Sequence, residues 1–145
     1  MSEHLKKAEE LRAIVTPHYN CAQSVLVPFA KDCGLTQEQA YKVGAHFGAG
    51  MKIGQTCGAI TGALMVLGLL GLDDVEITRQ FFKEIKDNHQ GCINCVDLLR
   101  INAEAGLEKK PHCDGMVYEA IKLLQRERRL PSVRGSDPEH KPGWR

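Results

Sequence analysis

The sequence lacks a long apolar run, an apolar leader at its start and a strong net charge. Its most apolar stretch, 57–72, is shorter than the ~20 residues that cross a membrane and contains four glycines, so we expect a buried helix there. Residues 1–7 are charged and contain no signal-like cleavage site, which favours a cytoplasmic protein. The net charge of +1 is too small to attract nucleic acid. We therefore expect neither a membrane nor nucleic acid as a partner.

Strand patterns are also scarce, whereas helical spacing with capping residues recurs along the chain. The expected fold is all-α: a single-domain compact bundle of about six to seven helices around a central apolar helix. This domain should cover 1–131, and the Pro-, Gly- and charge-rich segment 132–145 should be a flexible polar tail. The expected helices are about 2–15, 21–33, 36–47, 56–70, 74–88, 92–103 and 113–129.

Cysteine is the residue that the chain has in excess. Six cysteines in one domain in a reducing compartment favour metal binding or redox turnover over structural disulfides. Five of them fall where a helix is expected to start: Cys21, Cys57, Cys92, Cys95 and Cys113. The free N–H groups and the positive dipole end of a helix start stabilise thiolate, the form that ligates metals and attacks disulfides. If these ends converge, a cation or cluster would offset the repulsion between the thiolates.

A purely structural alternative is that the cysteines are small buried apolar side chains, as we expect for Cys33. The lone Cys92-x-x-Cys95 pair does not decide between site types, because a zinc ribbon usually needs a second pair and a thioredoxin-like site needs a βαβ pattern. His112, beside Cys113, is the one candidate imidazole ligand, although a solvated side chain is the simpler interpretation.

A set of short segments carries a resemblance to a known family. They are NCAQSVL at 20–26, FGAGM at 47–51, GQTCGAITGA at 54–63, CVDLL at 95–99, and Cys113. In this order they resemble the C_GCAxxG_C_C family. The resemblance implies a helical redox-active protein, related to the cluster-bearing helical region of split-Soret cytochromes, without an assigned reaction or substrate.

Carried onto this chain, the family cysteines are Cys21, Cys57, Cys95 and Cys113, and the extra ones are Cys33 and Cys92. The chain departs from the usual pattern at Cys92, Pro28, His46 and Arg100. Cys92 matters most, because a fifth nearby thiol could be an alternative ligand or a resolving cysteine. A haem attachment sequence is not formed, since Val96 rather than histidine follows Cys95.

Glycines flank the second family cysteine. Gly58 and Gly62 remove side chains from one face of the central helix, which lets another helix approach closely. The loop 48–54 could direct backbone N–H groups towards an anionic cluster, so Gly54 and Gly58 are candidate cofactor-contacting residues. The alternative is that these glycines serve only packing and a turn.

Three functions follow from these patterns. The first is an electron-transfer protein, rather than a substrate-turning enzyme, with an iron–sulfur or other thiophilic metal centre held by the four family cysteines and Cys92 as a spare ligand. The second is a thiol–disulfide redox protein in which Cys92 and Cys95 cycle, or either pairs with Cys57. The third is a structural zinc site in an interaction protein. We also expect a redox partner protein, and a homodimer is compatible with the glycine-rich faces.

Overall fold

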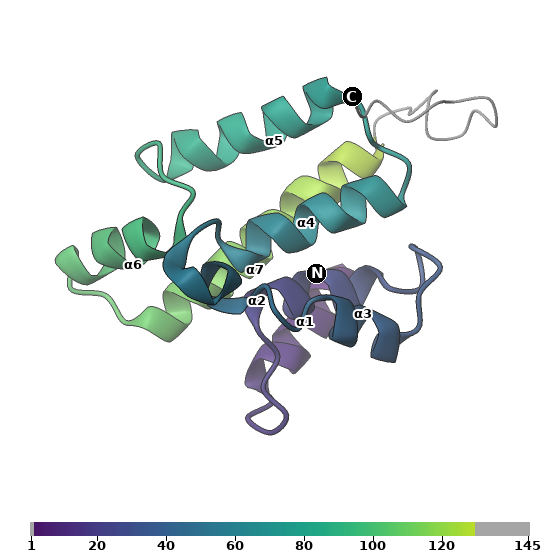
Figure 1. Cartoon of the computed structure of the whole chain (residues 1–145), viewed down its shortest axis with the longest axis horizontal. Helices are drawn as coiled ribbons and strands as arrows, with labels where there is room; N and C mark the ends of the chain where they lie inside the picture. Colours follow the sequence, from purple (N-terminus) through teal and green to yellow (C-terminus); the bar gives the residue numbers. More distant parts are fainter. Residues whose placement is uncertain (1, 130–145) are drawn as a thin grey trace.

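The computed structural model describes residues 2–129, and the regular structure in that range is helical (Figure 1). The α-helices are α1 (Glu3–Ala13), α2 (Cys21–Leu26), α3 (Gln37–Val43), α4 (Gly58–Leu69), α5 (Val75–Asn88), α6 (Cys95–Glu104) and α7 (Lys109–Arg129). Two shorter helical segments are η1 (Val27–Phe29), a 3-10 turn, and η2 (Gly50–Gly54), a π turn. The all-α prediction is confirmed, and the predicted tail 132–145 lies outside the described residues. No helix within 2–129 combines the length and apolarity that a membrane crossing requires.

Reciprocal caps fix the starts of two helices where the sequence predicts them. The Asn20 side chain accepts a hydrogen bond from the Gln23 N–H, and the Gln23 side chain accepts one from the Asn20 N–H. Thr36 and Gln39 form the same capping box at the start of α3. Each box satisfies two N–H groups that a helix start would otherwise leave unpaired. The first box therefore sets Cys21 as the first residue of α2.

Two other helix starts differ from the prediction. α6 begins at Cys95, and Cys92 lies in the preceding turn, where its N–H donates to His89 O over 3.0 Å. α7 begins at Lys109 rather than about 113, because Pro111 fits the first turn of a helix, where its missing N–H costs nothing. Cys92 is therefore not at a helix start, and Cys113 lies one turn inside its helix.

The core is formed where α4 packs against α2 and α7, with α1 covering α7 on another side (Figure 1). The predicted apolar stripe of α7 is confirmed, because every member is buried: Met116, Val117, Ala120, Ile121 and Leu124. The buried apolar side chains of α4 are Ala59, Ile60, Ala63, Val66 and Leu67. α6 lies beside η2, the turn that leads into α4, at one end of the molecule (Figure 1).

Glycines bring α2 and α4 into backbone contact, as predicted. A Cβ atom on Gly62 would lie 2.8 Å from the Ala22 carbonyl oxygen. A Cβ atom on Gly58 would lie 2.7 Å from the Phe47 carbonyl oxygen and 3.3 Å from the Cys21 Cβ. These distances are too short for any side chain larger than hydrogen, so the two glycines determine how closely the start of α2 approaches the start of α4.

Candidate cysteine site

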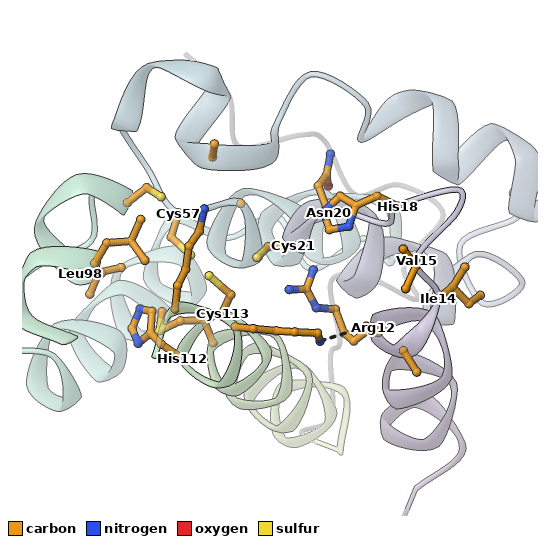
Figure 2. Close-up of a pocket in the computed structure, with 18 residues that line it drawn as sticks. Arg12, Ile14, Val15, His18, Asn20, Cys21, Cys57, Leu98, His112 and Cys113 are labelled. Carbon is orange, nitrogen blue, oxygen red and sulfur yellow. Dashed lines mark hydrogen bonds between the residues drawn. The ribbon is translucent and has the colours of Figure 1, made fainter. Parts of the chain in front are cut away.

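One cavity brings the four family cysteines together. It has a volume of about 540 Å³ and is lined by Cys21, Cys57, Cys95 and Cys113, from α2, the start of α4, α6 and α7 (Figure 2). Cys33 and Cys92 do not line it. Side chains separated by up to 92 residues in the sequence therefore face a common space.

Backbone pairing joins the two segments that carry Cys57 and Cys95. The Cys57 N–H donates to Ile93 O over 2.9 Å, and the Cys95 N–H donates to Gln55 O over 2.6 Å. Thr56 and Asn94, which lie between these two hydrogen bonds, form an isolated antiparallel β-bridge. This short pairing holds the starts of α4 and α6 next to each other.

The pKa values of Cys21 and Cys113 depend first on a hydrogen bond between the two thiols, and Figure 2 shows both side chains entering the same part of the cavity. The hydrogen bond from Cys21 lowers the pKa of Cys113 to about 7, and Arg12 and Lys109 assist, although burial opposes the shift. The same hydrogen bond and burial raise the pKa of Cys21. Cys113 is therefore the cavity cysteine that ionises first.

The other two cavity thiols are harder to ionise. Burial raises the pKa of Cys57 to about 11, although the N–H groups of Ala59 and Ile60 partly oppose it. Burial and the charge of Cys113 raise the pKa of Cys95. Each of the four cavity cysteines interacts electrostatically with at least two of the others. The thiols thus form one coupled group rather than separate sites.

The charged residues of the cavity lining are all cationic: Arg12, Lys109 and Lys110, with no Asp or Glu among the lining residues. The Arg12 side chain is only 7% exposed, and its Nε lies 2.6 Å from Asp114 Oδ1. Sequence reasoning missed Arg12 as a site residue, because an arginine beside the apolar stripe of a helix usually indicates only a solvated edge.

His112, the candidate imidazole ligand, lines the cavity, and so does His18. Burial, and then the charge of His89, lower the pKa of His112 and favour the neutral imidazole. His89 does not line the cavity, and its Nε2 lies 2.8 Å from Glu119 Oε1.

The loop before α4 contributes less to the cavity lining than its glycines suggest. Its lining residue is Ala49, whereas Gly54 does not line the cavity and faces the Val96 side chain. Gly58 lines the cavity, but close packing already accounts for it. Residues 49–52 all have positive φ, a left-handed conformation that costs non-glycine residues about 1–3 kcal/mol each.

Over residues 2–129, no three or more Cys, His, Asp or Glu side chains are close enough together to hold a metal ion. The lining nevertheless offers four sulfur donors in a cavity without competing carboxylates. Thiolates are the ligands that thiophilic metals and iron–sulfur clusters prefer.

The pKa order of the thiols predicts their reactivity. In reduced, metal-free protein, we expect iodoacetamide to modify Cys113 faster than Cys57, with a Cys113 rate that rises through about pH 7. Cys113 should react faster because a lowered pKa gives more thiolate at a given pH. Peptide mapping by mass spectrometry across pH 5.5–9 measures the two modification rates. Cys21→Ala removes the hydrogen bond that lowers the pKa of Cys113, so in this variant the modification rate of Cys113 should rise only at higher pH. A pH dependence equal to that of the wild type would show that Cys21 does not lower this pKa.

Comparison with known proteins agrees with the geometry. The family model described as "Putative redox-active protein (C_GCAxxG_C_C)" matches residues 19–127, most of the chain. The comparisons with curated proteins and with solved structures gave no match. The matched range contains all four cavity cysteines. The chain therefore belongs to the C_GCAxxG_C_C family.

Proposed function

We propose that this protein transfers electrons through an iron–sulfur centre held by Cys21, Cys57, Cys95 and Cys113. The observation that carries the proposal is the convergence of these four thiols, from four separate segments, on one cavity. Bound there, such a centre supplies one-electron redox chemistry, and the surrounding protein determines its solvent access and potential. Cys92 lies outside the cavity lining, so we assign it no ligand role.

The arrangement of the described side chains favours a cluster over a single ion. A structural zinc ion needs four ligands at about 2.0–2.3 Å from one point. The described part of the chain contains no group of three or more side chains placed for that arrangement. A cluster of several atoms takes ligands that lie further apart, and the four thiols of the cavity come from four separate segments.

The electrostatics of the lining agree with a bound anionic centre. Buried Cys57 and Cys21 have raised pKa values, so each stays a neutral thiol until a cationic group replaces its proton. Four cysteinates around iron leave a negative centre overall, and the charged lining residues are all cationic. The protein's own residues thus lower the cost of holding that charge away from water.

The test is anaerobic reconstitution of the full chain with iron and sulfide. The expected product contains bound iron and acid-labile sulfide and has a broad visible absorption that dithionite bleaches. A colourless, metal-free product after anaerobic reconstitution would contradict the proposal, as would stoichiometric zinc without sulfide after anaerobic purification. Aerobic preparations do not serve here, because oxygen destroys exposed clusters and oxidises the released thiols.

A second candidate is thiol–disulfide exchange, which the hydrogen-bonded Cys21–Cys113 pair favours. In this reaction the Cys113 thiolate attacks an external disulfide and releases one thiol; Cys21 then attacks the mixed disulfide and releases the second. Two electrons and two protons pass to the external disulfide. This pair differs from the predicted Cys92–Cys95 and Cys57 combinations. A Cys21–Cys113 disulfide formed reversibly in metal-free protein would support it, and random pairing would oppose it.

A further inference from the structure

Arg12 reaches the cysteine cavity from α1, which precedes the residues that match the family. Figure 2 shows its guanidinium directed towards the sulfur atoms of Cys21 and Cys113. Its charge interacts with both of these thiols. Arg12 is therefore a cation of the site that the family signature does not contain.

Contacts with α7 and the α1–α2 loop hold this guanidinium in place. Its Nε donates to Asp114 Oδ1 over 2.6 Å, and its Nη1 donates to Tyr19 O over 2.8 Å. Lys110 Nζ donates to Arg12 O over 3.1 Å and also to Asp114. A planar guanidinium can make these directed bonds at one edge while its charge stays beside the thiols. The Arg12 position is thus determined by partners other than the cysteines.

Burial separates Arg12 from the other cations of the cavity. Its side chain is 7% exposed, whereas that of Lys110 is 63% exposed. Asp114 offsets part of the Arg12 charge, but Lys110 in turn neutralises part of Asp114. Lys109 is exposed, and none of the described carboxylates lies within ion-pair distance of its Nζ. Water and salt screen exposed charges strongly and buried ones weakly.

We propose that Arg12 raises the reduction potential of the four-cysteine centre by fixing a buried positive charge beside Cys21 and Cys113. The inference rests on the proposed function. One electron added to the centre makes it one unit more negative, so a fixed positive charge stabilises the reduced form more than the oxidised form. α1 is thereby part of the redox site as well as part of the packing.

The first test is a redox titration of the reconstituted full chain. Arg12→Gln, which keeps hydrogen-bonding capacity but removes the charge, should shift the potential to more negative values, and Arg12→Lys should retain most of the wild-type potential. Lys109→Met should cause a smaller shift that fades at high salt, whereas the Arg12→Gln shift should persist. Lys86→Met, an exposed residue of α5 outside the cavity lining, is the control and should cause none. An Arg12→Gln potential equal to wild type would overturn the inference.

A second measurement needs no bound centre. In reduced, metal-free protein, the ratio of Cys113 alkylation by anionic iodoacetate to that by neutral iodoacetamide reports the local charge, because the thiolate fraction cancels in the ratio. The ratio should fall in Arg12→Gln and be restored in Arg12→Lys. If the ratio in Arg12→Gln equals that of the wild type, the inference is wrong. This holds even if the Arg12→Gln protein no longer binds iron and sulfide. Wild-type protein that binds no iron and sulfide would instead overturn the proposed function, so the two failures are distinguishable.

Discussion

Cys57→Ser is expected to reduce bound iron and acid-labile sulfide to background after anaerobic reconstitution. Cys57 is 6% exposed, and it interacts electrostatically with the other three cavity cysteines. A serine hydroxyl at this position is a much poorer ligand for iron than a thiolate. Metal and sulfide analysis, with the visible spectrum, measures the loss.

Cys33→Ser and Cys92→Ser are the matched controls for this experiment. Both residues are partly buried cysteines outside the cavity lining, so each variant should bind iron and sulfide like wild type. Circular dichroism of all three variants separates loss of a ligand from loss of the fold. Iron retained in Cys57→Ser, or lost in Cys92→Ser, would show that the proposed ligand set is wrong.

Gly62→Ala is expected to lower the free energy of unfolding by about 1–3 kcal/mol, the usual cost of overpacking a tight core position. The new Cβ would lie 2.8 Å from the Ala22 carbonyl oxygen and 3.1 Å from the Ala22 Cα. These are backbone atoms of α2 and cannot rotate away, so the two helices must separate. A urea denaturation series on metal-free protein measures the change.

Gly68→Ala on the same helix is the control, because nothing lies within 4 Å of its added Cβ. Alanine should stabilise this helical position by about 0.5–1 kcal/mol relative to glycine. Opposite signs at the two glycines are therefore expected. A Gly62→Ala protein as stable as wild type would mean that the contact between α2 and α4 adjusts without cost.

Local signals made much of the fold predictable. The capping boxes at Asn20 and Thr36 locate the starts of α2 and α3, and the apolar stripe of α7 gives its buried face. The resemblance identified the four cysteines that the structure brings together. What these features share is that each depends on residues a few positions apart, or on a pattern already associated with one family.

Long-range features were not predictable in the same way. The pairing that places Cys57 beside Cys95 involves only a few residues, too few to produce a strand-like alternation in the sequence. The burial of Arg12 depends on Asp114, 102 residues away. The sequence predicts a helix from about Cys92, directly after the breaking residues 88–91, whereas the helix begins only at Cys95.

The pairing of 55–57 with 93–95 also links the motions of two proposed ligands, Cys57 and Cys95. Because two backbone hydrogen bonds close that junction, neither sulfur-bearing helix start can fray while the other stays ordered. The amide protons of Cys57 and Cys95 should then exchange with solvent in a single cooperative event. A fluctuation that exposes one of these sulfurs would release half of the proposed ligand set at once, so loss of the centre should begin at this junction.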